Sequence, residues 1–298
     1  MPLTRAAVGL TTTPVTHHVD ARWLMSYAAA LGDTDVGYLD TSSASGIVSH
    51  PLFAICPEWS VALASRDLLK SKGLTDQEFR RGVHATHDSH IYRLFRADEE
   101  IITESVIVGV EQRKPGAFVT TRFDSTTSQG ELVCRSFNGT LFRGVEVAPG
   151  NLSVQETAGL PAPPAVAGID ETVDQTIEIA VPRNLAHIYT ECARIFNPIH
   201  TDVAVAHSAG LPDFILHGSA TLALAVSAIV RNYAAGSPER IVRISAQFRG
   251  MVLLPSKLTL RCGVPRTAKH GVSIGFDVNN ADGNPVIGKG SIDVSGSN

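Results

Sequence analysis

The pattern of hydrophobic and polar positions divides the chain into two stretches with similar contents. In the first stretch, apolar residues recur at helical spacing from Ala21 to Leu31, with Asp20 as the N-cap. A second apolar segment runs from His50 to Leu69, and Pro51 suits the first turn of a helix there. Alternating and β-branched residues then predict antiparallel strands over 89–95, 101–110, 117–123 and 132–142.

The order of elements repeats in the second stretch. The pattern predicts a strand over 176–181, a helix over 184–194 and a long apolar helix over 218–235. Further strands are predicted near 241–248, 257–262, 272–278 and 285–294. Such a repeat indicates two copies of one α+β unit, in which an antiparallel sheet wraps around an apolar helix.

A segment rich in Ala, Pro and Gly separates the two stretches. It includes Pro161 to Pro164 and has almost no periodic signal, so we interpret 149–168 as a linker. The predicted organisation is therefore an N-terminal unit over 1–148, this linker, and a C-terminal unit over 169–298.

Composition narrows the class of protein. The formal net charge is −4 and neither sign forms a long run, which argues against nucleic acid as the main partner. Four widely spaced cysteines without a Cys-x-x-Cys pair indicate neither a disulfide framework nor a zinc site. Because the N-terminus lacks an apolar targeting segment and no long apolar run follows, we expect a soluble, cytoplasmic protein that does not bind a membrane.

The strongest chemical signal lies in the second stretch, in the segment from Ile195 to Asp202. Asn197 and Pro198 force a sharp turn, because proline locks φ and the residue before it avoids the α region. This turn aims the imidazole of His200, while Asp202 is the expected N-cap of a short helix over 203–208. The pair His217 and Gly218 then opens the long apolar helix.

The two copies align around this segment. Asp33 falls opposite Ile195 and His50 opposite His217, although the spacings differ: 50 − 33 = 17 in the first copy and 217 − 195 = 22 in the second. The first copy keeps an acidic residue, but Tyr38 stands five residues later, where a second histidine would be.

These residues carry a resemblance to the MaoC-like, (R)-specific enoyl-CoA hydratase/dehydratase family in its two-hotdog form. The family motif runs Asp-x-Asn-Pro-x-His-x-Asp and is followed later by His-Gly. The matching positions here are Asn197, Pro198, His200, Asp202, His217 and Gly218. Ile195 departs from the pattern, since it stands at the position of the first Asp. The resemblance implies a double hotdog fold in which the first copy is degenerate.

The resemblance also implies an acyl-thioester site. Its catalytic residues would be His200, Asn197 and Gly218, whose backbone N–H at the helix start would polarise the thioester carbonyl. Ile195, Phe196, His217 and Ser219 would contact substrate, and Asp33 and Tyr38 are candidates for a second site. We expect no cofactor and no metal. His84, His87 and His90 recur at spacings of three, but their strand-like context favours a solvated edge over a metal site.

The residues leave three functions open. The first is a hydratase/dehydratase that adds or removes water at C2–C3 of an enoyl or 3-hydroxyacyl thioester, with coenzyme A or acyl-carrier protein as the thiol. The second is an isomerase or other proton-transfer enzyme that uses His200 without the usual Asp. The third is a catalytically silent subunit that binds acyl thioesters. His217 is either a structural residue at the helix entry or an acid, and a homodimer is a further expectation.

Overall fold

The computed structural model describes residues 2–149, 172–268 and 271–296. The chain forms two compact units, each assembled from separate parts of the sequence. Unit 1 comprises Met1–His17, Pro57–His90 and Glu100–Ala165, and unit 2 comprises His18–Cys56, Ile91–Glu99 and Val166–Asn298. Residues 150–168 of the predicted linker lie outside the described residues, and the two predicted sequence halves stay a prediction about the repeat.

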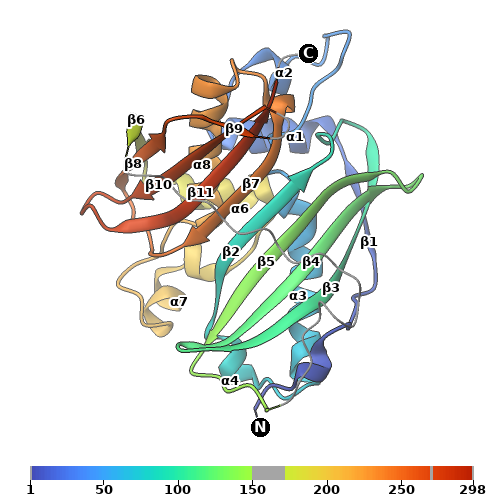
Figure 1. The fold of residues 1–298 in the computed structure, drawn as a ribbon, viewed down its shortest axis with the longest axis vertical. Coiled ribbons are helices and arrows are strands. Elements are labelled where there is room, and N and C mark those ends of the chain that lie inside the picture. The colour runs from blue at the N-terminus through green and yellow to red at the C-terminus, as the bar shows by residue number, and fades with distance from the viewer. Residues whose placement is uncertain (1, 150–171, 269–270, 297–298) are drawn as a thin grey trace. The chain divides into compact units, whose positions relative to one another are not determined.

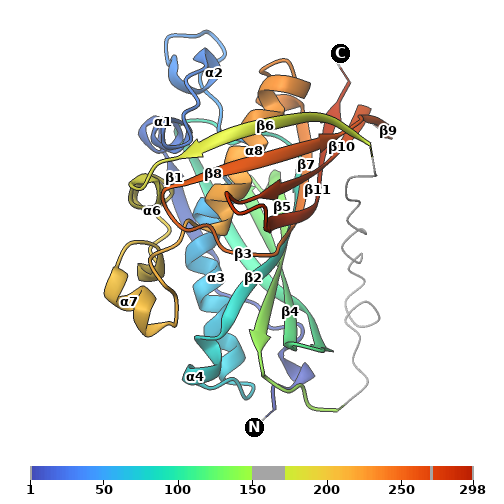
Figure 2. The same cartoon turned by 90° about the vertical axis from the view of Figure 1, so that its left-hand side faces the viewer.

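Unit 1 is built on an antiparallel sheet. Its strands lie in the order β3–β4–β5–β2, where β2 is Gly82–Ile91, β3 is Glu99–Arg113, β4 is Gly116–Thr127 and β5 is Leu132–Arg143. Helix α3 (Ile55–Lys70) runs alongside these strands (Figure 2). The short helices η1 (Arg5–Ala7) and α4 (Asp76–Phe79) complete the unit, and a core cluster includes Leu3, Leu69, Ile107 and Phe142.

In unit 2 the strands lie in the order β7–β11–β10–β8–β6, with β9 paired to β10 (Figure 1). These strands are β6 (Val173–Val181), β7 (Ile241–Phe248), β8 (Ser256–Gly263), β9 (Arg266–Ala268), β10 (Gly271–Asn279) and β11 (Pro285–Ser295). Its helices are α1 (Ala21–Ala30), α2 (Val36–Leu39), α6 (Leu185–Ala193), η2 (Pro198–His200), α7 (Val203–Ser208), α8 (Gly218–Tyr233) and η3 (Pro238–Arg240). Strand β1 (Val15–Val19) spans the boundary between the two units.

Helix α8 is the core of unit 2. Every residue from Ser219 to Val230 is buried, as expected for a helix that is apolar on all sides. Its first residue, Gly218, lies so close to β7 that a Cβ there would be 3.1 Å from a ring carbon of Phe248. The absence of a side chain at Gly218 thus lets the start of α8 approach the sheet.

Most elements predicted from the sequence are confirmed, but the strand predicted over 89–95 is wrong in its bounds, since β2 runs from Gly82 to Ile91 and the chain bends at Tyr92 and Arg93. Asp20 caps α1 by accepting a hydrogen bond from the Trp23 N–H at 2.7 Å, and Asp202 caps α7 through the N–H groups of Ala204 and Val205. β1, α2, α4 and β9 were not predicted, because short elements carry few periodic positions.

The predicted helix start at Pro51 is wrong. The chain makes turns from His50 until α3 begins at Ile55, and the His50 Nδ1 atom accepts the Leu52 N–H at 3.1 Å. This side-chain bond competes with helical hydrogen bonding in the segment.

Two further observations concern the described part of the chain. No helix in it is long and apolar enough to cross a membrane. All four cysteines lie within it, and none of them forms a disulfide.

Candidate active site

The turn between α6 and α7 places the central histidine. Helix α6 ends at Arg194, which adopts the left-handed conformation with φ 57°, and the Ile195 N–H donates to the Thr190 carbonyl at 3.1 Å. Asn197 caps η2, and its Oδ1 accepts the Ile199 N–H at 3.4 Å. His200 is the last residue of η2, so its backbone is fixed by the Asn-Pro turn that the sequence predicts.

His200 is held as a neutral base. Its Nδ1–H donates to the Ile215 carbonyl at 2.8 Å, which leaves the lone pair on Nε2. Burial lowers the pKa of His200 to about 4, although the bond to the carbonyl opposes this shift. Near neutral pH the imidazole can therefore accept a proton at Nε2.

The ring of His217 stacks on that of His200. The ring centroids are 3.7 Å apart and the planes make an angle of 26°. His217 is 2% exposed, and its Nε2 lies 3.2 Å from the Thr190 hydroxyl. Burial holds the pKa of His217 well below its usual range, and the neighbouring His200 adds to the effect. The two imidazoles are neutral together at neutral pH.

The start of α8 offers hydrogen-bond donors beside this pair. The Thr221 N–H donates to the His217 carbonyl at 3.0 Å, and no side chain caps the helix. The N–H groups of Gly218 and Ser219 precede this first helical bond, so they have no partner within the helix. Together with the helix dipole they suit an oxygen that gains negative charge.

The two predicted substrate-contacting residues before Asn197 differ in exposure. The side chain of Ile195 is buried, whereas Phe196 is 59% exposed. An exposed aromatic ring beside the turn is available to a ligand, while Ile195 packs into the interior of unit 2.

No carboxylate among the described residues hydrogen-bonds or ion-pairs with His200. Asp202 caps α7, and Asp213 pairs with Arg183 at 2.9 Å. The side chain of Glu191 is exposed. The apolar Ile195 therefore has no acidic substitute in the described part of the chain.

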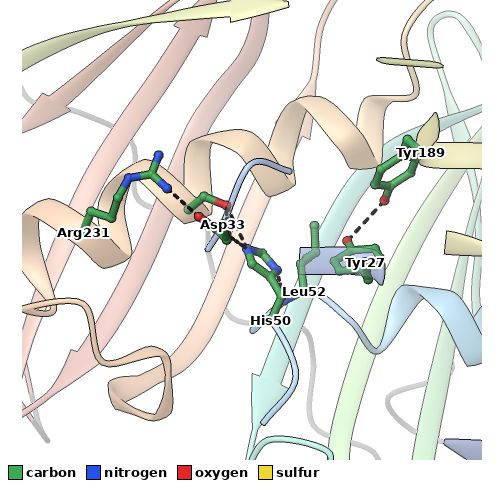
Figure 3. Close-up of polar contacts among 7 residues, drawn as sticks. Tyr27, Asp33, His50, Leu52, Tyr189 and Arg231 are labelled. Atoms are coloured by element: carbon green, nitrogen blue, oxygen red, sulfur yellow. Dashed lines mark hydrogen bonds and ion pairs between the residues drawn. The ribbon is translucent and has the colours of Figure 1, made fainter. Parts of the chain in front are cut away.

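Asp33, the counterpart of Ile195, belongs to a different cluster. Its carboxylate accepts hydrogen bonds from the Ser227 hydroxyl at 2.6 Å and from Arg231 at 2.5 Å (Figure 3). The His50 Nε2 lies 3.2 Å from the same Ser227 oxygen. Because His50 Nδ1 accepts the Leu52 N–H, Nε2 carries the proton and donates to Ser227. The chain of bonds runs from His50 through Ser227 to Asp33.

This cluster pairs a buried carboxylate with a half-exposed guanidinium, next to a neutral histidine. Burial lowers the pKa of His50 to about 3. Burial also raises the pKa of Asp33, although the bonds from Ser227 and Arg231 oppose that shift. Tyr38 is buried beside it, with its ring centroid 6.3 Å from that of His50. The structure thus brings Asp33 and Tyr38 to His50 but not to His200.

The interpretation of the β2 histidines as a solvated edge is wrong for His87, whereas His84 and His90 are partly exposed. His87 is 1% exposed, its Nδ1 lies 2.8 Å from Asn138 Oδ1, and its Nε2 lies 2.7 Å from the Ser89 hydroxyl. Both ring nitrogens are used within the sheet of unit 1, because β2 turns this face toward the interior. In the described ranges no group of three His, Cys, Asp or Glu could hold a metal ion.

Several residues at the two sites were not identified from the sequence. Thr190 and the Ile215 carbonyl orient the two imidazoles, and Ser227 and Arg231 complete the Asp33 cluster. Ser227 and Arg231 lie four residues apart on α8 and so face the same side. Two polar residues four apart on an otherwise apolar helix were the available signal.

Comparison with known proteins finds two matching family models and several similar sequences. Residues 165–280 match the model of the MaoC like domain, and residues 6–136 match the FAS1-like dehydratase domain region. The chain is 26% identical over 265 residues to the peroxisomal multifunctional enzyme type 2 of Drosophila melanogaster, covering 86% of this chain and 42% of that protein. It is 25% identical over 171 residues to the peroxisomal enoyl-CoA hydratase 2 of Arabidopsis thaliana, covering 56% of this chain and 54% of that protein. The chain spans about half the length of these relatives.

Solved structures agree in fold. The MaoC-like dehydratase of Phytophthora capsici superposes with a TM-score of 0.80 at 17% identity, over 98% of this chain and 97% of that one. A Mycobacterium tuberculosis protein described as having a double hotdog fold superposes with a TM-score of 0.61 at 15% identity, over 97% of this chain and 96% of that one. Together these matches show a MaoC-like domain over residues 165–280, a FAS1-like dehydratase domain region over residues 6–136, and a double hotdog fold.

Proposed function

We propose that the protein is a hydratase/dehydratase that adds water reversibly to C2–C3 of an enoyl thioester. The observation that carries the proposal is the position of His200. Its Nε2 lone pair is free and its ring lies against that of His217. His217 in turn directly precedes the uncapped start of α8. A base and an anion-stabilising helix terminus are the two components that conjugate addition to a thioester requires.

In the hydration direction His200 acts first as a base. Nε2 takes a proton from water while the water oxygen forms a bond to C3. The π pair of the C2–C3 bond becomes the C1–C2 double bond of an enolate, and the π pair of the carbonyl moves to the thioester oxygen, which gains negative charge. The N–H groups of Gly218 and Ser219 would hydrogen-bond this oxygen, and the positive end of the α8 dipole would add to their effect.

The second step completes the proton balance. The imidazolium of His200 returns its proton to C2, the carbonyl re-forms, and the product is the 3-hydroxyacyl thioester. One imidazole carries the proton in both steps, so the reaction balances without a carboxylate at Ile195. In the dehydration direction His200 takes the proton from C2 and gives it to the departing hydroxyl group.

Asn197 has an indirect role in this scheme. Its Oδ1 accepts the Ile199 N–H, and its carbonyl accepts the His200 N–H at 3.1 Å. It therefore sets the turn on which the base stands. The exposed ring of Phe196 is available to pack against the acyl group or its carrier.

Coenzyme A is the carrier that we propose, because the Arabidopsis relative is an enoyl-CoA hydratase by name. Acyl-carrier protein is the other carrier to be tested. A homodimer is a further prediction, and light scattering of the purified chain would check it.

The test follows trans-2-butenoyl-CoA by the absorbance of its conjugated thioester. We expect the chromophore to disappear with formation of 3-hydroxybutyryl-CoA, and His200→Ala to lower kcat by about 10²–10⁴-fold. His207→Ala, at an exposed histidine of α7, is the matched control and should leave kcat unchanged.

Three results would count against the proposal. Movement of the double bond of a longer enoyl-CoA without uptake of water would identify an isomerase. Binding of the thioester without turnover, in a panel of CoA and carrier-protein substrates, would identify a binding subunit. Full activity of His200→Ala would remove His200 from the mechanism.

A further inference from the structure

The proton balance above leaves the ring of His217 without a chemical role, although the ring is completely enclosed. It lies between two other rings, with its centroid 3.7 Å from that of His200 and 5.1 Å from that of Tyr189. Only 2% of His217 is exposed. The face of His200 that it covers is therefore closed to water.

His217 is anchored to two helices. Both the N–H and the hydroxyl of Thr221 donate to its carbonyl, at 3.0 and 3.2 Å, which ties its backbone to α8. The Thr190 hydroxyl on α6 lies 3.2 Å from its Nε2. A side chain held by two packed helices offers a rigid surface, and rigid supports are what precise positioning of a base requires.

The hydrogen bond of His200 cannot fix its ring alone. The Nδ1–H···O=C bond to Ile215 restrains one atom, and the imidazole could still swing about that contact. The ring of His217, whose centroid is 3.7 Å away and whose plane is inclined by 26°, restricts this freedom, because a swing toward it would bring the two rings into collision. The direction of the Nε2 lone pair is then determined.

Acid catalysis by His217 does not fit its surroundings. Burial keeps the pKa of His217 well below its usual range, and a proton on His200 would depress it further. The ring is therefore neutral at neutral pH, and a neutral imidazole is a very weak proton donor. His200 and His217 are the titratable groups of this stack, and Tyr189 on the other side of His217 is also neutral because burial raises its pKa.

We propose that His217 is a positioning residue, whose ring fixes the plane of His200 by stacking and excludes water from one of its faces. The kinetic part of the proposal rests on the proposed function, whereas the effect on the state of His200 does not.

Two substitutions at His217 distinguish the contribution of the aromatic ring from that of its two nitrogen atoms. His217→Phe keeps an aromatic ring against His200 and removes both nitrogens, and His217→Leu removes the ring. The ¹⁵N NMR signals of the His200 imidazole report its tautomer and its pKa without any substrate. His18→Leu, at an exposed histidine that pairs with Asp98, is the matched control.

The expected results differ between the variants. His217→Phe should keep the Nδ1–H tautomer of His200, its low pKa and nearly all of kcat. His217→Leu should admit water and raise the pKa of His200 toward its ordinary value, mix the two tautomers, and lower kcat by about 10²-fold with little change in KM. His18→Leu should change neither quantity at His200.

The results that overturn the proposal are equally specific. An unchanged tautomer and pKa of His200 in His217→Leu would reject positioning, whatever the enzyme does with thioesters. Loss of turnover in His217→Phe with an unchanged His200 spectrum would assign proton transfer to the nitrogens of His217. An inactive wild type in which His217→Leu still alters the His200 spectrum would reject the proposed function and leave positioning intact.

A milder variant covers the case in which His217→Leu fails to fold. Thr190→Val removes the hydroxyl that holds Nε2 and keeps the shape of the side chain. It should move the tautomer and pKa of His200 in the same direction by a smaller amount. An unchanged His200 in a folded Thr190→Val would contradict the anchoring of His217 through α6.

Discussion

The hydroxyl oxygens of Tyr27 and Tyr189 lie 3.3 Å apart in the interior of unit 2 (Figure 3). Each tyrosine stands six residues before the aligned position of its own copy, since 33 − 27 = 6 and 195 − 189 = 6. Each ring also packs beside the histidine of its own copy, with centroids 5.6 Å apart for Tyr27 and His50 and 5.1 Å apart for Tyr189 and His217. Equivalent residues of α1 and α6 therefore meet.

This hydroxyl pair leads to a stability prediction. Tyr27→Phe should lower the free energy of unfolding by about 1–3 kcal/mol, because the Tyr189 hydroxyl would stay buried without this partner. Tyr189→Phe should have a similar effect, and the double variant should cost less than the sum. Urea denaturation of the four proteins measures the coupling, and strictly additive losses would contradict it.

The meeting of the two tyrosines agrees with the alignment of the two copies that was made from the sequence. Apolar periodicity predicted α1, α6 and α8, and the Asn-Pro turn predicted the setting of His200. The repeat placed Asp33 opposite Ile195 without any structural information. Local signals of this kind can be read from the sequence because residues close together along the chain determine them.

What the sequence could not predict depends on long-range contacts. Asp33 and Arg231 are 198 residues apart, and the His200–His217 stack requires the loop between α7 and α8 to return to η2. No local pattern encodes the choice of a partner at such distances. For the same reason the burial of His87 was missed, since strand spacing does not reveal which face is covered.

The Asp33 cluster should be essential for stability. Asp33→Asn would leave the guanidinium of Arg231 without its charged partner, and Ser227 and His50 would lose the end of their hydrogen-bond chain. Because the Arg231 side chain is 48% exposed and can be solvated, we expect a loss of about 1–3 kcal/mol, the cost of impaired hydrogen bonding at a buried polar group. Thermal and urea unfolding would measure the loss.

Asp35→Asn is the matched control, at an exposed acidic residue two positions away. It should leave the stability nearly unchanged. Equal stabilities of Asp33→Asn and the wild type would mean that the cluster contributes nothing net. Clear hydratase activity that disappears in a well-folded Asp33→Asn would instead make Asp33 part of a second active site.

A buried acid in unit 1 predicts a pH dependence of stability. Burial of Glu58 raises its pKa to about 8, and Ser136 and Asn138 offset only part of the effect. In the unfolded chain a glutamate titrates at about 4.3. Between these values the folded protein keeps a proton that the unfolded chain has released, so the free energy of unfolding falls as pH rises.

The slope is about 1.4 kcal/mol per pH unit and ends near the folded pKa. Glu58→Gln should abolish this contribution, so the variant should gain stability relative to the wild type from pH 5 to pH 8. Urea denaturation across this range measures the difference, with the exposed Glu100→Gln as control. A constant difference between Glu58→Gln and the wild type would contradict the buried, protonated state.

The substituted motif position gives the sharpest prediction for activity. Ile195→Asp would place a carboxylate five residues before His200, where the family motif has one, in a site that already contains Asn197 and the His217–Gly218 helix start. It should raise turnover of trans-2-butenoyl-CoA, provided that water still enters, because a carboxylate can hold the attacking water. It should also lower stability, since Ile195 is only 4% exposed and a buried charge without partners is costly or is neutralised by an upward shift of its pKa.

Ile195→Asn separates these two effects. The amide has nearly the shape of the carboxylate but no charge, so it should share part of the stability loss without the gain in kcat. The decisive measurement is the pH dependence of kcat/KM in the three proteins, because a new carboxylate would add an ionisation that Ile195→Asn lacks. If the wild type hydrates enoyl thioesters rapidly and Ile195→Asp is slower, then a group other than a residue at position 195 already assists His200.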